Sequence, residues 1–87
     1  MSTNKRPAVD IEKLCTENIP LVYYVYWHKF NKYQNIKERF YDELISAGFL
    51  GLLQAARRYD PSTGYKFSTF AAASIERRMY TEARRIF

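Results

Sequence analysis

Apolar residues recur every three or four positions through the second half of the chain, which is the spacing of one face of an α-helix. The first such series is Tyr41, Leu44, Gly48, Leu52, Ala55 and Tyr59. The second is Ala71, Ile75, Met79, Ala83 and Ile86. The two series predict a helix over about residues 38–59 and another over about 68–86. The flank of the first series is apolar too, so this helix is expected to be buried on two sides or to present an interface.

The first part of the chain predicts shorter elements. Residues 1–9 are polar and contain Pro7, so we expect a flexible N-terminal segment. Asp10 is a suitable N-cap for a short first helix. Pro20 fits the first turn of a second helix, with Asn18 as its possible cap.

Residues 21–30 are dense in β-branched and aromatic side chains, which would also suit a strand. We predict a helix because Leu21, Val25 and His28 have helical spacing and no partner strand is visible. Residues 31–37 are polar with weak periodicity and are expected to form a loop.

Three features shape the two long helices. Gly48 and Gly51 weaken a helix, so their presence predicts the close approach of another helix. The segment 60–64 contains proline and glycine at positions typical of a turn. Ser68 is expected to cap the last helix. The predicted fold is a compact all-α domain of three to four helices covering residues 10–87.

Charge is unevenly distributed around the net value of +5. Residues 57–87 hold seven Lys or Arg against three Asp or Glu, a net of +4, whereas residues 10–56 hold five against six, a net of −1. This asymmetry suggests that one surface meets phosphate and another meets protein.

Several function classes find no support in the sequence. No nucleophile with a base, carboxylate pair or phosphate-binding glycine loop is present, so we expect neither an enzyme nor a cofactor. The single cysteine, Cys15, excludes an internal disulfide and a multi-cysteine metal site, and is expected to be a small buried group near a helix start. His28 stands alone and is expected to be solvated or hydrogen-bonded. No apolar run reaches the roughly 18 residues of a membrane span, and the cytosol of a bacterium, or of one infected by a phage, is the expected compartment.

The most informative stretch alternates aromatic and basic residues beside a helix start. Tyr65, Lys66 and Phe67 lie in the loop, and the last helix carries a row of side chains opposite its apolar face. This row, called the basic row below, consists of Phe70, Ala73, Arg77, Tyr80 and Arg84, with Arg78 and Arg85 at its flanks. Rings on which bases stack, next to cations that follow the phosphates, are suited to single-stranded nucleic acid. A solvated basic face is the alternative.

The order and spacing of residues 57–71 resemble the second conserved region of bacterial sigma-70 family factors. The resemblance extends over about residues 18–87 and is most specific at Asp60-Pro61 and at Gly64-Tyr65-Lys66-Phe67-Ser68-Thr69-Phe70-Ala71. It implies a helical domain of the sigma region-2 type that binds core RNA polymerase and holds the non-template strand of the opened minus-ten promoter element.

The resemblance also assigns roles on the DNA side. Phe70 matches an aromatic that receives a flipped base, and Tyr65, Lys66 and Phe67 match loop residues that accompany melting. Ser68 matches a family serine, for which a capping role is favoured over base contact. Ala73-Ser74 stand where housekeeping members carry two tryptophans, and Glu76 replaces a commonly basic position. The chain therefore resembles an alternative factor more than a housekeeping one.

On the protein side, the resemblance implies that the helix over residues 38–59 docks on the coiled coil of the polymerase clamp. The implied contact residues are Glu43, Leu44, Ile45, Ser46, Phe49 and Leu50. The usual Asp-Leu-Ile-Gln-Glu-Gly pattern reads Glu43-Leu44-Ile45-Ser46-Ala47-Gly48 here, so a charge and an amide are replaced. For Phe49 and Leu50, core packing is the alternative.

Two other functions remain open at this point. One is an interaction module that occupies the polymerase clamp or an anti-sigma protein without melting promoters. The other is a helical duplex-binding protein of the helix-turn-helix kind, which would prefer intact duplex over a forked probe. An anti-sigma factor, or a companion protein that supplies minus-thirty-five recognition, is a possible further partner.

Overall fold

The computed structural model describes residues 9–30 and 34–86, and it describes side chains within residues 9–30 and 40–86. All regular structure in these ranges is helical: α1 (Ile11–Glu17), α2 (Ile19–Lys29), α3 (Gln34–Arg58) and α4 (Phe67–Ile86), with a 3₁₀ turn at Pro61–Thr63. The predicted all-α domain of three to four helices is confirmed. The expected flexible segment, residues 1–9, lies outside the described residues except for Val9.

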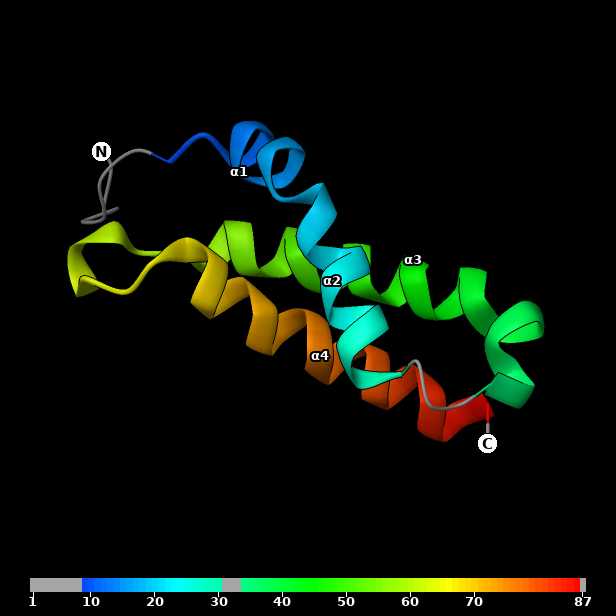
Figure 1. Cartoon of the computed structure of the whole chain (residues 1–87). Helices are drawn as coiled ribbons and strands as arrows, with labels where there is room; N and C mark the ends of the chain where they lie inside the picture. The colour runs from blue at the N-terminus through cyan, green and yellow to red at the C-terminus, as the bar shows by residue number, and fades with distance from the viewer. Residues whose placement is uncertain (1–8, 31–33, 87) are drawn as a thin grey trace.

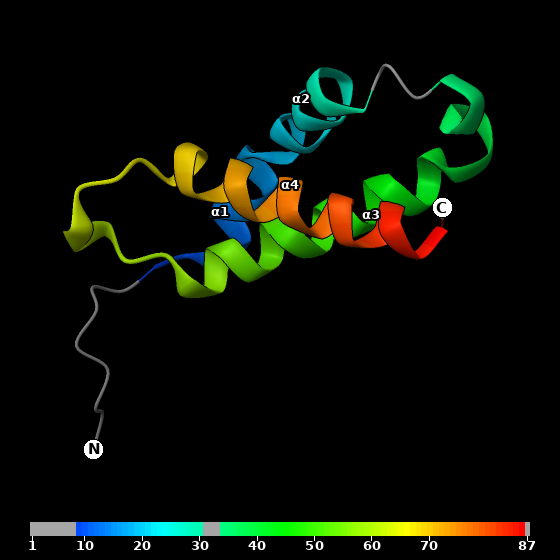
Figure 2. The ribbon, with the colours of Figure 1, turned by 90° about the horizontal axis from the view of Figure 1, so that it is seen from below.

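The helices form two layers. The long helices α3 and α4 lie side by side and run in opposite directions, joined by the turn (Figure 1). On one face of this pair, α2 crosses and contacts both long helices, and α1 contacts α3 (Figure 2). The opposite face of the α3–α4 pair is not covered by any other described helix, and much of its surface is therefore available to partners.

The first two helices begin as the sequence predicts. Asp10 caps α1, where its Oδ1 accepts a hydrogen bond from the backbone N–H of Lys13 at 3.0 Å. Pro20 lies in the first turn of α2. Asn18 precedes α2 but does not cap it with its side chain, because its Nδ2 donates to the carbonyl oxygen of Leu14 at 2.8 Å.

Burial explains why the segment rich in β-branched and aromatic residues is a helix. Val22, Val25 and Tyr26 lie on one side of α2 and are buried in the core. A helix places these three side chains together against α3 and α4, and this packing outweighs their local preference for a strand.

The core is built from the predicted apolar series. Leu44, Leu52 and Ala55 on α3 are buried against Ala71, Ile75 and Met79 on α4. Tyr41, Tyr59 and Ala83 pack at its edges. The close approach predicted from the two glycines is confirmed: a Cβ atom at Gly51 would lie 2.8 Å from the carbonyl oxygen of Ser74, and one at Gly48 would lie 2.5 Å from Cε of Met79.

Two predicted boundaries are wrong. The expected loop over residues 31–37 is helical from Gln34 onward, and residues 31–33 lie outside the described part of the chain. Ser68 is not the cap of α4, because the helix already begins at Phe67 and its first turn closes on the carbonyl oxygen of Lys66. Phe67 is buried against the core, and this packing starts the helix earlier than the serine suggests.

Candidate functional site

The turn between the long helices has a defined conformation. Asp60 accepts hydrogen bonds at Oδ1 from the backbone N–H of Ser62 at 3.0 Å and from the Ser62 hydroxyl at 2.7 Å. Gly64 ends the 3₁₀ turn with φ of 87°, a left-handed conformation that glycine adopts without strain. The predicted turn is confirmed, and it brings the aromatic loop back over the end of α3.

Tyr59 anchors this loop. Its hydroxyl donates to the carbonyl oxygen of Tyr65 at 2.6 Å, and its ring packs edge-on against Phe67, with centroids 5.1 Å apart. The ring of Phe70 lies 6.0 Å from that of Tyr59. This contact could not be predicted from the sequence, because a hydrogen bond from a side chain to a backbone carbonyl six residues away has no sequence signature.

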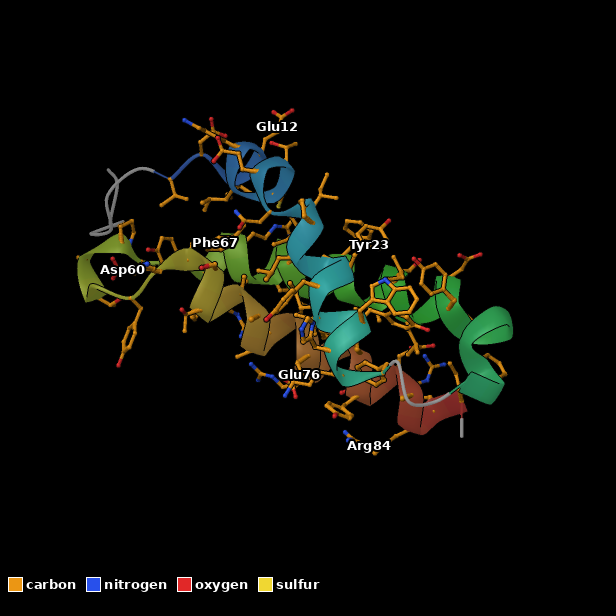
Figure 3. The ribbon with its side chains drawn as sticks, viewed as in Figure 1. Glu12, Tyr23, Asp60, Phe67, Glu76 and Arg84 are labelled. Carbon is orange, nitrogen blue, oxygen red and sulfur yellow. The ribbon has the colours of Figure 1, made fainter. Side chains whose placement is uncertain are left out.

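The three loop residues predicted to contact nucleic acid differ in accessibility. Tyr65 is 69% exposed and Lys66 is also exposed. Phe67, labelled in Figure 3, is the first residue of α4 and is buried, with its ring edge-on to that of Tyr59. In this conformation Phe67 packs beneath the loop in the core, and of the three residues only Tyr65 and Lys66 are accessible to nucleic acid.

The basic row is only partly exposed. Phe70 is 38% exposed, and Ala73, Arg77 and Arg84 are exposed as well. Tyr80 is half-buried, because its ring packs on Phe30 of α2 with centroids 4.8 Å apart. The row therefore has one aromatic face, Phe70, at the loop end and cations along the rest of the helix.

A salt bridge joins the edge of this row to α2. Nζ of Lys29 lies 3.7 Å from Oε2 of Glu76. Glu76 and Arg84 lie along the same edge of α4 (Figure 3). Lys29 compensates the negative charge of Glu76, so this edge of α4 keeps the net positive charge of Arg77 and Arg84.

The predicted protein-binding residues of α3 separate into two groups. Leu44 and Ile45 are buried in the core, at 0% and 7% exposure, so neither side chain offers contact surface in this conformation. Glu43 and Ser46 are exposed, and Leu50 is 40% exposed. Phe49 is half-buried with its ring edge-on to Tyr23 of α2, 5.9 Å between centroids.

A groove of about 350 Å³ runs along the exposed residues of α3 and the facing side of α4. Its lining comprises Asp42, Glu43, Ser46, Ala47, Leu50, Arg78 and Glu82. Arg78 was expected at the flank of the basic row, and the structure instead places it in this groove. Asp42 and Glu82 were not among the predicted site residues, although the spacing of 42, 46 and 50 and of 78 and 82 puts each set on one helix face.

Cys15 and His28 both lie on helices other than those that form the groove and the basic row. Burial raises the pKa of the Cys15 thiol, and the nearby Arg57 acts in the opposite direction more weakly. Cys15 is half-buried within α1 and does not lie at its start. His28 is exposed, with Nδ1 2.9 Å from the carbonyl oxygen of Tyr24. Among the described residues, no three His, Cys, Asp or Glu side chains gather as a metal site would require.

The sequence that forms this arrangement matches a known protein family. The family model described as sigma-70 region 2 matches residues 14–86. This range covers α2, α3, α4 with its basic row, and all of α1 except its first three residues. The chain belongs to the sigma-70 family.

Curated relatives of this sigma-70 family member are themselves sigma factors. The chain is 32% identical over 74 residues to the RNA polymerase sigma factor FliA of Pseudomonas aeruginosa, a match covering 85% of this chain and 29% of FliA. It is 43% identical over 60 residues to the RNA polymerase sigma factor SigA of Microcystis aeruginosa, covering 69% of this chain and 13% of SigA.

A third alignment is shorter. The sigma factor SigA2 of Synechococcus elongatus is 52% identical over 40 residues, which is 46% of this chain and 12% of SigA2. The chain thus spans less than a third of the length of these relatives. No solved structure matches it significantly. No helix in the described ranges is both long and apolar enough to cross a membrane.

Proposed function

We propose that this chain is a transcription-initiation module that binds core RNA polymerase and holds the non-template strand of an opened minus-ten element. The observation that carries the proposal is the position of Phe70. Its ring is partly exposed at the start of α4, beside a loop fixed by Tyr59, and the exposed Arg77 and Arg84 follow it on the same helix face.

This arrangement has the two components that single-strand binding requires. An exposed aromatic ring offers a stacking surface that contributes about 1–3 kcal/mol per base. Arginines spaced along the helix attract the phosphates that flank the captured base. Tyr65, which is exposed at the loop, supplies a second ring on the same end of the molecule.

The departure from the tryptophan pair of housekeeping factors has a structural counterpart. Ser74 is half-buried, and its hydroxyl donates to the carbonyl oxygen of Gly51 at 2.8 Å, so it fastens α4 to α3. Ala73 is exposed but presents only a methyl group. Without aromatic wedges at these two positions, we expect promoter opening to depend more on the minus-ten sequence, as in an alternative sigma factor.

The contact with polymerase is proposed for the exposed part of α3. Glu43, Ser46 and Leu50 present a carboxylate, a hydroxyl and an apolar side chain on one helix face beside the groove. The buried Leu44 and Ile45 support this face from within the core. The named relatives are RNA polymerase sigma factors, which is consistent with such a surface.

The test uses the full chain with core RNA polymerase from its own organism. The chain is expected to bind core, and the complex is expected to retain a forked probe with a single-stranded minus-ten element better than a fully duplex probe. Glu43→Lys is expected to weaken core binding. Glu12→Lys, the same charge change at an exposed position of α1, is the matched control.

Two results would contradict the proposal. If the wild-type chain did not bind core polymerase, the transcriptional role would be wrong. If the complex bound forked and duplex probes equally, the chain would be a core-binding protein without a strand-capture role.

A further inference from the structure

Among the described residues that line the groove between α3 and α4, Arg78 is the one whose side chain carries a positive charge; the other charged residues among them are Asp42, Glu43 and Glu82. It lies on the side of α4 that faces α3, apart from Arg77 and Arg84 of the basic row. None of the proposed contacts with DNA uses it.

The close approach of the two long helices holds Arg78 in place. Its Cγ lies 3.1 Å from the position that a Cβ atom would take at Gly51, so the side-chain stem crosses α3 where that helix has no side chain. Its Nε is buried and has no hydrogen-bond partner among the described residues. A buried N–H of a charged group without an acceptor is unfavourable, so the charge of Arg78 lowers the stability of the isolated chain.

The groove carries both signs of charge. Three carboxylates line it, those of Asp42 and Glu43 on α3 and of Glu82 on α4, and Glu82 also pairs with Arg85 at 3.1 Å. Arg78 lies one turn before Glu82 on α4, about 6 Å along the helix axis, with its stem beside Gly51.

We propose that Arg78 is a specificity-determining docking residue that binds a carboxylate on a helix of core RNA polymerase. The occupant presents an acidic side chain to Arg78 and a basic side chain, about one helical turn away, to the carboxylates of the groove. The proposal rests on the function proposed above, in which this part of α3 meets polymerase. A carboxylate satisfies the charge of the guanidinium, and mixed charge on the occupant matches the mixed charge of the groove.

The sequence of α3 makes this contact particular to the chain. The family pattern has Gln-Glu where this chain has Ser46-Ala47. A carboxylate at position 47 would lie in the same groove as Arg78 and would pair with it inside the molecule. With alanine there, the arginine stays available to the partner.

Two substitutions test the proposal, and each is expected to keep or raise the stability of the fold while weakening the binding of core polymerase. Arg78→Met keeps the stem over Gly51 and removes the charge, so the variant is expected to be at least as stable as wild type but to bind core about tenfold more weakly. Ala47→Glu restores the family residue and pairs with Arg78, so it is expected to raise the thermal midpoint and also to weaken core binding. Arg58→Met, at an exposed arginine of the last turn of α3, is the matched control and should bind as wild type.

The measurements are thermal unfolding of each chain and its equilibrium affinity for core polymerase at two salt concentrations. Loss of binding without loss of stability, together with a shallower salt dependence for Arg78→Met, supports the proposal. Tighter binding by Ala47→Glu would overturn it, because the groove would then favour the family carboxylate. A wild-type dimer that Arg78→Met dissociates would also overturn it, by assigning the groove to a second copy.

The failure of this inference is distinct from the failure of the proposed function. If the wild-type chain binds core, Glu43→Lys weakens that binding, and both groove variants bind as wild type, only the role of Arg78 is wrong. If the wild-type chain does not bind core, both are wrong.

Discussion

The hydroxyl of Tyr59 donates a 2.6 Å hydrogen bond to the backbone carbonyl oxygen of Tyr65, and this bond links the end of α3 to the loop that precedes α4. The loop carries the most exposed aromatic ring of its neighbourhood, at Tyr65, and leads directly to Phe70. A fixed loop loses less conformational entropy when a strand binds, so this single bond contributes to the proposed binding surface as well as to the fold.

The first prediction concerns this bond. Tyr59→Phe keeps the ring contact with Phe67 and removes the hydroxyl, so it is expected to destabilise the fold by only about 1 kcal/mol. Affinity for a forked probe in the assembled polymerase complex is expected to fall several-fold, because the loop must then be ordered on binding. Tyr24→Phe, at an exposed tyrosine of α2, is the matched control. Unchanged probe affinity of Tyr59→Phe would show that loop order does not limit binding.

The second prediction concerns the proposed stacking ring. Phe70→Ala is expected to lose about 1–3 kcal/mol of affinity for a single-stranded minus-ten element, with little change for fully duplex DNA. The measurement compares the two probes in the complex with core polymerase. Ile19→Ala, which shortens a side chain of nearly equal exposure on α2, should change neither affinity. Equal losses on both probes would reduce the basic row to a general phosphate-binding surface.

The third prediction separates charge from stacking. Arg84 is exposed near the end of α4, so Arg84→Ala is expected to weaken binding to all sequences by a similar factor. The slope of log affinity against log salt concentration should decrease by about one, corresponding to one lost phosphate contact. A loss confined to one promoter sequence would instead assign Arg84 to base recognition.

The fold could be predicted from the sequence because helical periodicity is strong in α3 and α4. The same periodicity could not tell which apolar residues of α3 are exposed. Leu44, Ile45 and Leu50 are all apolar, yet only Leu50 reaches the surface, because the other two are buried in the core. A helix apolar around most of its circumference has no polar face to mark its solvent side.

Adjacent positions on α4 show a similar limit. Arg77 and Arg78 are neighbours in the sequence and point about 100° apart on a helix. Arg77 is exposed on the basic row, whereas Arg78 lies in the groove beside α3. Which of the two meets α3 depends on the helix-helix contact at Gly51, and that contact is a property of the tertiary structure.

The fourth prediction concerns alkaline pH. Burial raises the pKa of Tyr26, with a smaller contribution from Tyr41, and burial likewise raises the pKa of Tyr41. The folded chain therefore holds these protons more tightly than the unfolded chain. The stability they contribute is fully present below the unfolded value of about 10 and is lost as pH rises through the folded values. Urea unfolding between pH 8 and 11 should show this decline, and Tyr26→Phe should make it shallower. An equally steep loss of stability in the wild type and in Tyr26→Phe would contradict the assignment to Tyr26.

The last prediction uses the two glycines of α3 to test the helix contact on which the groove and the core depend. Alanine at either position would favour the isolated helix by about 1 kcal/mol. At Gly51, the new Cβ would meet the carbonyl oxygen of Ser74 at 2.8 Å and Cα of Ile75 at 2.9 Å. These are backbone atoms, so α4 itself must shift, and Gly51→Ala is expected to be destabilising by about 1–3 kcal/mol.

At Gly48, the nearest atoms belong to side chains, Cε of Met79 at 2.5 Å and Cγ1 of Val22 at 2.8 Å. The end of a methionine side chain can adopt another rotamer, whereas Val22 is stiff at χ1, so Gly48→Ala is expected to destabilise the fold, but by less than Gly51→Ala. Urea unfolding of both variants measures the difference. Because the shift of α4 in Gly51→Ala also displaces Arg78 from the groove, this variant should bind core polymerase more weakly than Gly48→Ala. Equal stability and equal core binding of the two variants would mean that α4 does not approach α3 at Gly51 as closely as the structure has it.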